Sequence, residues 1–464
     1  MNELTPDRFD AGPALLAPEL VLLPEGPARE HAAVVADGVF TAVGPLERLR
    51  REHPDLTPVA LPGHLLMPGF VDAHHHLTQV LGSSLAFGEP SEIFRRVWIP
   101  LEGELDEESA HLSAKLASLQ ALRGGFTTVA EAGTRAPVDV EAVAAATREA
   151  GLRCVLGLVC NDVGEPGTTP SEVLARAEKH LARYEGDDLV HASLAVSIPE
   201  AATERTLRDT AGLAREAGAV VQIHVNEHLA SVERSLVRHG VRPLEHLDRA
   251  GALGPQLLAA HATLLTAAEV ELLRGRGAAV SYNPIASAWK GDAVAPALTL
   301  AQTGVRFGLG TDGTRGDAFR LLDAAESAQR IAYGLTMGDS SCGGGWTWLE
   351  HGTRASADAV GLGALTGEIA AGRAADFLLV DVTVPELRPS WDLPWELVRL
   401  ADRDQITAVV VGGRLRLWKG WPTDWDGRAL VERAAEVGRE VVARARITRA
   451  HPVSTEHRAR NGAR

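Results

Sequence analysis

The segment LLMPGFVDAHHHL, residues 65–77, is an apolar run of strand length that ends in three consecutive histidines. Seven more short apolar segments follow it, and each is separated from the next by a stretch long enough for a helix. They read TTVAEAG (127–133), RCVLGLVC (153–160), ASLAVSI (192–198), VVQIHV (220–225), LLAAHA (257–262), AAVSYNP (278–284) and RFGLGTDG (306–313). Strict alternation of strands and helices predicts a parallel sheet. About 250 residues separate Leu65 from Gly313, which matches eight βα units and favours a (β/α)8 barrel over an open, doubly wound sheet.

Short β-like runs with glycine and proline turns lie on both sides of the expected barrel, in residues 18–64 and 375–418. They lack long helical periods and therefore predict one small β-sandwich domain built from both chain ends. The fold class is thus α/β, a (β/α)8 TIM barrel with a small β-sandwich. The expected division is 1–64 and 366–426 for the β-sandwich, 65–365 for the barrel, and 427–464 for a C-terminal helix and charged tail.

The composition is that of a globular enzyme, with 45% hydrophobic and 23% charged residues. A formal net charge of −15 argues against a nucleic-acid or membrane partner, since either would need a cationic patch. Three cysteines without a CxxC pair fit a reducing compartment. The first 25 residues do not resemble a signal peptide, and no apolar run is long enough to span a membrane. We therefore expect a cytoplasmic protein that acts on a small molecule.

Histidines and an aspartate fall at the C-terminal ends of several expected strands. His74 and His76 follow the first strand, His224 and His261 lie near the ends of the fifth and sixth, and Asp312 follows the eighth. These strand ends converge on one face of a barrel, where active sites are built. In an extended HxH segment both outer side chains point to the same side. We therefore expect His74, His76, His224 and Asp312 to hold one divalent metal.

Imidazole and carboxylate ligands suit Zn2+, and also Fe2+ or Mn2+, with a position left open for water. Glu227, three residues after His224, is the expected proton shuttle. Asp312 is expected to orient and deprotonate the water, and His261 to polarise the substrate or stabilise a developing anion. Each residue also has a structural interpretation. His261 alone could be a structural hydrogen-bonding residue, and Glu227 could complement a helix dipole.

The segments MPGFVDAHHHL, IHVNE, LLAAHA and GLGTDG together resemble the amidohydrolase superfamily, and within it the cytosine-deaminase-like and triazine-hydrolase branch. The SxNP-type turn at Ser281–Pro284 and GEIAAGRAADFLLVD at residues 367–381 extend the resemblance through nearly the whole chain. It implies the same four metal ligands, with Glu227 and His261 acting on the substrate. Binuclear relatives carry a carboxylated lysine on the third or fourth strand, where this chain has no lysine, so the resemblance implies one metal ion. The ligand types make zinc the expected ion, with iron as the alternative. It also implies a homodimer or larger homo-oligomer.

Four further residues are candidates for substrate binding. Gln79 matches a position where a polar side chain often lines the pocket in this branch, although it could be an ordinary polar loop residue. The other three mark departures from the resemblance: Trp289 and Lys290 follow the SxNP turn, and Arg315 follows TDG. Lys290 could pair with a substrate carboxylate or could be a solvated loop charge. The pocket is therefore expected to prefer a more polar or acidic ligand.

The leading hypothesis is a metal-dependent aminohydrolase, a deaminase that removes ammonia from an aminated purine, pyrimidine, pterin or s-triazine ring. Glu227 would protonate the ring nitrogen next to the amino-bearing carbon. Dechlorination or dealkylamination of a triazine-like ring and opening of a cyclic amide of the imidazolone type are alternatives on the same scaffold. A noncatalytic barrel is a further alternative, and the complete set of ligand-type residues argues against it.

Overall fold

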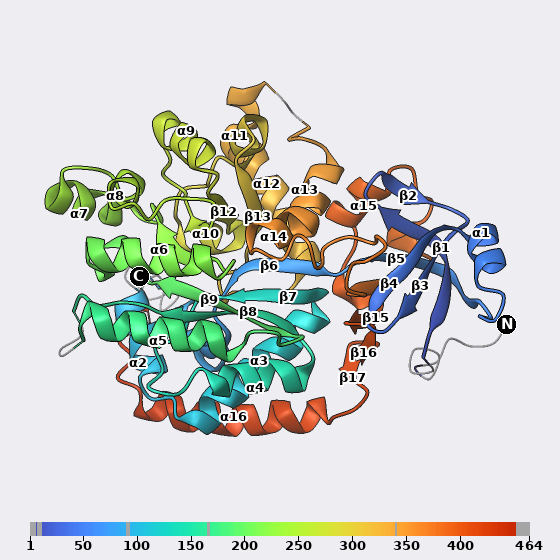
Figure 1. Cartoon of the computed structure of the whole chain (residues 1–464), viewed down its shortest axis with the longest axis horizontal. Helices are drawn as coiled ribbons and strands as arrows, with labels where there is room; N and C mark the ends of the chain where they lie inside the picture. The colour runs from blue at the N-terminus through green and yellow to red at the C-terminus, as the bar shows by residue number, and fades with distance from the viewer. Residues whose placement is uncertain (1–5, 7–11, 90–92, 165–167, 339–340, 452–464) are drawn as a thin grey trace, which may run out of the picture.

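The computed structural model describes residue 6 and residues 12–89, 93–164, 168–338 and 341–451. Within them the chain forms a barrel and a separate mixed sheet, joined side by side (Figure 1). The first and last parts of the chain both contribute to the mixed sheet, and the middle of the chain forms the barrel.

The barrel has eight parallel strands that pair in sequence order, and β13 packs against β6 so that the circle nearly closes. Its strands are β6 (Phe70–His75), β7 (Phe126–Glu131), β8 (Arg153–Val159), β9 (Val190–Val196), β10 (Val221–Val225), β11 (Leu257–His261), β12 (Ala279–Tyr282) and β13 (Arg306–Leu309). Every residue of β6, β7, β11 and β12 is buried, as expected for a parallel sheet covered on both faces. The predicted barrel with a second, smaller β unit is confirmed.

The opening apolar run contains parts of two strands, and our expectation of a single strand there was wrong. β5 (Val59–Pro68) belongs to the mixed sheet and β6 to the barrel. Gly69 alone separates them, and a Cβ atom on Gly69 would lie 2.1 Å from Thr127 Oγ1. Only glycine permits this close approach between β6 and β7, a constraint that hydrophobicity alone does not reveal.

Helices cover the outside of the barrel (Figure 1). They are α3 (Glu107–Arg123), α4 (Glu141–Ala150), α5 (Pro170–Arg183), α6 (Glu204–Glu216), α7 (Leu229–His239), α8 (Pro243–Arg249), α9 (Ala267–Arg276), α10 (Pro284–Lys290), α11 (Ala297–Thr303), α12 (Ala318–Met337), α13 (Gly345–Gly352) and α14 (Arg354–Ala359). Shorter pieces before α3 are η2 (Leu77–Ala86), η3 (Phe94–Trp98) and α2 (Ile99–Glu102), and η4 (Pro199–Ala201) follows β9. Many of these helices start at a capping side chain. Thr169 and Glu172, for example, form a capping box at the start of α5.

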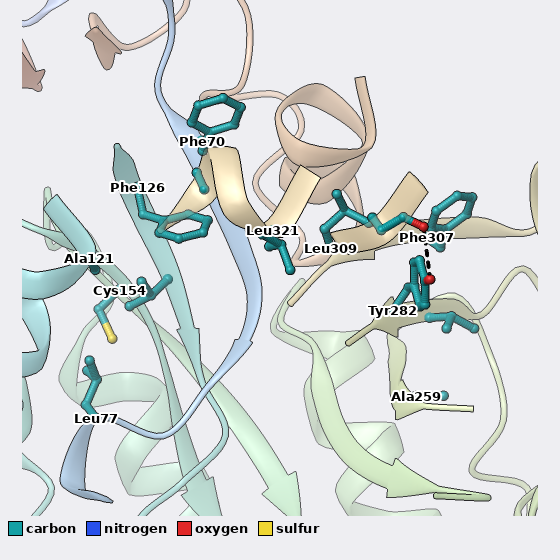
Figure 2. Packing of buried hydrophobic residues seen from close by; sticks show 14 of the residues in the cluster. Phe70, Leu77, Ala121, Phe126, Cys154, Ala259, Tyr282, Phe307, Leu309 and Leu321 are labelled. Atoms are coloured by element: carbon teal, nitrogen blue, oxygen red, sulfur yellow. Dashed lines mark hydrogen bonds between the residues drawn. The ribbon is translucent and has the colours of Figure 1, made fainter. Parts of the chain in front are cut away.

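Large apolar side chains fill the space between the strands and the helices. Figure 2 shows Phe70 and Phe126 from the first two barrel strands beside each other, with Phe307 and Tyr282 on the far side of the cluster. Phe70 also contacts Phe319 of α12 edge to face, with ring centroids 5.3 Å apart. Phe70 and Phe126 are the first residues of β6 and β7, so this contact lies at the N-terminal ends of those strands.

The mixed sheet has nine strands, and both chain ends supply them. They are β1 (Ala14–Leu23), β2 (Gly26–Ala28), β3 (His31–Ala36), β4 (Val39–Pro45), β5, β14 (Phe377–Asp381), β15 (Ile406–Val411), β16 (Arg414–Trp418) and β17 (Trp421–Pro422). Strands from both parts of the chain share one apolar core around Phe40, Leu66, Phe377 and Val410. The short segments α1 (Leu46–Glu52), η5 (Pro385–Leu387), α15 (Leu393–Arg399) and η6 (Arg403–Gln405) connect its strands.

A buried ion pair joins the barrel to the region just before β14. Arg153 of β8 contacts both carboxylate oxygens of Asp376, at 3.0 and 3.1 Å. The same carboxylate accepts hydrogen bonds from Thr366 Oγ1 and the Gly412 backbone. With 3% and 0% of their side chains exposed, the two charges are compensated by each other, by these bonds and by the bond that Arg153 donates to the Asp188 carbonyl oxygen at 2.6 Å.

The C-terminal helix α16 (Gly427–Arg444) lies along α3 and η2, below the barrel in Figure 1. Residues 452–464 of the expected charged tail lie outside the described residues. The expected domain division stays a prediction, and β5 extends past residue 64, its first boundary. No helix in the described part of the chain is both long and apolar enough to cross a membrane.

Candidate metal centre and active site

Side chains from three strand ends converge at the C-terminal end of the barrel. His74 belongs to β6 and His76 follows it, His224 belongs to β10, and Asp312 follows β13. One potential ligand atom from each of the four lies within 4.8 Å of the others. The structure therefore brings together the four predicted metal ligands, which lie up to 238 positions apart in the sequence.

The spacing of these atoms is that of a metal's ligand shell. Asp312 Oδ1 lies 3.4 Å from His74 Nε2 and 3.3 Å from His76 Nε2, and His76 Nε2 lies 3.3 Å from His224 Nε2. Ligand atoms held about 2.0–2.1 Å from a tetrahedral zinc ion are separated by about 3.3 Å. The donor set and its spacing both fit a divalent cation.

The histidine nitrogens also lack the partners that buried polar atoms normally have. Both ring nitrogens of His74 and Nδ1 of His76 are buried without a hydrogen bond, which is costly unless another group satisfies them. His224 Nδ1 lies 2.8 Å from the Ser197 carbonyl oxygen. Donation of this bond places the proton on Nδ1 and leaves the Nε2 lone pair facing the other ligands, the orientation that a metal-binding histidine needs.

Burial and neighbouring charges favour neutral side chains at His76 and His224 and an ionised side chain at Asp312. Burial, followed by the neighbouring His74, lowers the pKa of His76 to about 3, although Asp312 acts in the opposite direction. Burial and the adjacent histidines hold the pKa of His224 well below its ordinary value. Burial alone would raise the pKa of Asp312, but Lys290, His74 and His76 hold it well below the usual range. Neutral imidazoles beside a carboxylate are the protonation states that bind a dication.

His261 is held beside the ligands by the SxNP turn. Ser281 donates to Asn283 Oδ1 at 2.7 Å, so the Asn283 amide nitrogen faces His261 Nδ1 at 3.2 Å. The proton of His261 is therefore on Nε2, which lies 3.6 Å from Glu227 Oε1 and 3.9 Å from Asp312 Oδ2. A Cβ atom on Gly310 would lie 2.3 Å from Asn283 Oδ1, so glycine is required at this position.

Glu227 lies close to the metal-ligand cluster and is not one of its four members. Its Oε1 atom accepts a hydrogen bond from Lys290 Nζ at 2.7 Å, and the same ammonium lies 2.6 Å from Asp312 Oδ2. Burial alone would raise the pKa of Glu227, but His261 and Lys290 lower it. The two carboxylates raise the pKa of Lys290 against the opposite effect of burial. An ammonium bridge thus joins the predicted proton shuttle to Asp312.

Backbone strain is concentrated at the same strand ends. Asn226, His261, Ala262 and Asp312 have positive φ angles of 53°, 71°, 49° and 56°. A left-handed conformation of a non-glycine residue costs about 1–3 kcal/mol and persists where the surrounding structure enforces it, often at active sites. The strain supports a functional interpretation of this end of the barrel.

The four candidate substrate-binding residues lie in different environments. Gln79 is buried in η2, and Trp289 of α10 packs edge to face on Phe87 with ring centroids 5.3 Å apart. Lys290 points inward, with 13% of its side chain exposed. The solvated loop charge that the sequence left open therefore does not apply to it. Arg315 pairs with Asp317 at 3.2 Å and has 46% of its side chain exposed.

Two groups of contacts near the site were not predicted from the sequence. Asp72 accepts hydrogen bonds from the backbone of His74 and from the backbone and hydroxyl of Thr311, and His75 contacts the same hydroxyl at 2.7 Å. These bonds tie the first strand end to the eighth. The position of Asp72, two residues before the HxH motif on the same strand, was the available signal.

The second group is a chain of three side chains at the edge of the site. His228 Nδ1 lies 2.9 Å from Asp292 Oδ1, and His228 Nε2 lies 3.4 Å from Glu227 Oε1. Burial alone would lower the pKa of His228, but Asp292 and Glu227 raise it. Asp292 carried no signal in the sequence, because only the fold brings it next to residues more than 60 positions away.

Comparisons with known proteins agree with this geometry. A sequence model of the amidohydrolase family matches residues 65–416. The chain is 32% identical over 403 residues to a 5-methylthioadenosine/S-adenosylhomocysteine deaminase of Syntrophobacter fumaroxidans, an alignment that covers 85% of this chain and 90% of that protein. It is 30% identical over 366 residues to a 5'-deoxyadenosine deaminase of Methanothermobacter thermautotrophicus, covering 77% and 83% of the two chains.

Among solved structures, the chain is similar to an adenosine deaminase from Xanthomonas campestris with bound zinc. The TM-score is 0.85 at 27% identity, covering 93% of this chain and 99% of that one. An atrazine chlorohydrolase from Arthrobacter aurescens has a TM-score of 0.81 at 19% identity, covering 92% and 100% of the two chains. At that identity the second likeness concerns the fold alone.

Proposed function

The chain belongs to the amidohydrolase family. From this premise we propose that it removes the amino group of the purine ring by hydrolysis, as ammonia, from an adenosine derivative altered at its 5' position. The relatives named above are deaminases of such compounds and align with most of the chain. The observation that carries the proposal is the convergence of His74, His76, His224 and Asp312 beside Glu227. The leading hypothesis from the sequence, a metal-dependent aminohydrolase of an aminated heterocycle, agrees with these names.

We propose that the four converging residues hold a single metal ion and that this ion is zinc. The unpartnered nitrogens of His74 and His76 support this proposal, as does a donor spacing that suits tetrahedral zinc. When bound, a divalent ion supplies a water molecule acidic enough to act as a nucleophile near neutral pH. The lack of a lysine on β8 and β9 is consistent with one ion instead of two.

The side chains divide the proton transfers between them. Asp312 Oδ1 faces His74 and His76, whereas Oδ2 points away from these ligands. Oδ2 can therefore orient the attacking water and take its proton. Glu227 is ionised before the reaction, so it first receives this proton from Asp312 and then delivers it to the ring nitrogen next to the carbon under attack. His261, with its proton on Nε2, donates to the oxygen that arrives at that carbon. The second proton of the attacking water passes from the new hydroxyl group, by way of Asp312, to the amino group. The C–N bond then breaks, ammonia leaves, and the ring carbon keeps the oxygen as a carbonyl.

The predicted substrate-binding roles of Gln79, Trp289 and Arg315 remain proposals, as do a homodimer and a cytoplasmic location. Gln79 and Trp289 lie on η2 and α10, segments that follow strand ends of the barrel. Arg315 follows Asp312 by three residues but pairs with Asp317, which weakens the case that it binds substrate.

An ammonia-release screen tests the proposed function. Zinc-loaded protein is incubated with adenosine, 5'-deoxyadenosine, 5-methylthioadenosine and S-adenosylhomocysteine, and in parallel with a chlorotriazine and a cyclic imidazolone. We expect ammonia and the corresponding 6-oxopurine from at least one adenosine derivative. Chloride release or ring opening without any ammonia from the purines would replace the proposal by one of the two alternatives considered from the sequence.

A further inference from the structure

The side chain of Lys290 lies in the middle of the proposed active site. Lys290 is the last residue of α10, and Gly291 after it adopts a left-handed conformation with φ 73°. The turn directs the lysine inward, where Nζ lies 2.7 Å from Glu227 Oε1 and 2.6 Å from Asp312 Oδ2. The side chain is 13% exposed, so the ammonium is held mainly by these two carboxylates.

This position is also the one that the substrate needs. A reacting group belongs about 3 Å from both the proton shuttle and the group that activates water. In an aminated ring, the ring nitrogen faces Glu227 and the amino group lies next to it, on the carbon that water attacks. The Lys290 ammonium donates to both carboxylates. The substrate's amino group would donate to Asp312, and its ring nitrogen would donate to Glu227 once it has taken the proton that Glu227 delivers. The lysine and the substrate therefore cannot occupy the site together.

We propose that Lys290 is a specificity-determining residue, whose ammonium holds the place of the substrate's N–C–N edge and yields only to ligands whose edge, once its ring nitrogen is protonated, offers N–H donors to both Glu227 and Asp312. The inference rests on the proposed aminohydrolase function. The aminopurine edge satisfies both carboxylates as a protonated amidine, the form that it takes after its ring nitrogen has received the proton from Glu227. A chlorinated carbon or a cyclic amide offers one N–H group at most, which leaves one buried carboxylate without a partner, a substantial penalty.

The arrangement allows the lysine to leave without disturbing the ligand cluster. Asp312 contacts Lys290 through Oδ2 and the histidines through Oδ1, so the two sets of contacts are separate. Residues 291–296 after α10 form no helix. Asp292, two residues further along, offers a carboxylate at the edge of the site.

Binding of the smallest amidine provides a test that does not depend on turnover. Formamidinium is titrated calorimetrically into zinc-loaded wild type, Lys290→Met and the control Lys179→Met, whose lysine lies exposed on α5. We expect Lys290→Met to bind at least about tenfold more tightly than wild type, because apparent affinity falls with the fraction of protein in the competent state. The control should match wild type. Equal affinity in all three proteins, or no binding to Lys290→Met, would overturn the proposal.

A second measurement uses the unaltered protein, in case Lys290→Met does not fold. The sequence has four lysines, Lys115, Lys179, Lys290 and Lys419, so reductive methylation followed by mass spectrometry resolves each one. In zinc-loaded wild type we expect slow methylation of Lys290 and fast methylation of exposed Lys179. Saturating formamidinium should raise the rate at Lys290 and leave Lys179 unchanged.

An unchanged rate at Lys290, with formamidinium shown to bind, would overturn the proposal. Failure of the proposed function is distinguishable, because it appears in the ammonia screen, whereas neither lysine experiment measures deamination.

Discussion

Replacing Glu227 by glutamine removes the proposed proton shuttle but keeps a side chain of the same size. The Oε1 atom of Glu227 lies 2.7 Å from Lys290 Nζ, 3.4 Å from His228 Nε2 and 3.6 Å from His261 Nε2. Glutamine keeps one oxygen that can accept these contacts, but it cannot carry a proton to the substrate. Lys290 retains Asp312 at 2.6 Å, so the ammonium is not left without a carboxylate.

The size of the effect follows from this single lost step. General acid–base catalysis contributes about 10²–10⁴-fold, which corresponds to about 2.7–5.4 kcal/mol of activation free energy. We expect kcat of Glu227→Gln to fall by that factor. Zinc content should stay at one ion per chain, because Glu227 is not among the four converging ligands.

The assay measures kcat and KM by ammonia release, together with zinc content by atomic absorption. Glu233→Gln is the matched control, since Glu233 is exposed on α7, six residues further along the chain, and should behave as wild type. A kcat within about tenfold of wild type would refute the role of Glu227 as the shuttle. Loss of zinc from Glu227→Gln would show instead that Glu227 is a ligand.

Three further outcomes are expected. Arg153→Met should lower the free energy of unfolding in urea by about 3–5 kcal/mol, because Asp376 would stay buried without its charged partner. The control Arg176→Met, at an exposed arginine, should change it little. Equal urea midpoints for Arg153→Met and wild type would show that the ion pair does not stabilise the fold. Burial and Arg153 lower the pKa of His191 to about 4, so between pH 6.5 and pH 4 the unfolded chain binds more protons than the folded one. The free energy of unfolding should therefore fall as the pH falls, by up to about 1.4 kcal/mol per pH unit. His191→Asn should flatten this slope, and an unchanged slope would contradict the assignment. Removal of the metal by a chelator should abolish ammonia release and lower the melting temperature. Free zinc at about 1,000 times its Kd should restore about 4 kcal/mol of stability. A melting temperature that does not depend on zinc would argue against the site.

The sequence was most informative where a signal is local. Each barrel strand is a short apolar run with a helix after it, so the eight segments could be counted, and in a barrel the residues at the C-terminal strand ends must meet. For this reason His74 and His224 could be placed together although 150 residues separate them.

What the sequence could not provide depends on contacts between distant segments. The run from Leu65 to Ala73 reads as one strand because hydrophobicity does not reveal that Gly69 must pass within reach of Thr127. Lys290 is charged and follows a turn, features typical of a solvated loop residue. Its inward direction depends on the left-handed turn at Gly291 and on two carboxylates supplied by other strands.

The central claim is that one metal ion, held by His74, His76, His224 and Asp312, supports deamination of an adenosine derivative. Zinc titrated into the metal-free protein, while deamination of the best substrate from the ammonia screen is followed by ultraviolet absorbance, tests it most directly. We predict that the rate rises linearly to one zinc ion per chain and then stays constant, and that His74→Ala shows no such rise. Full activity without metal, or a rise that continues to two ions per chain, would contradict the account.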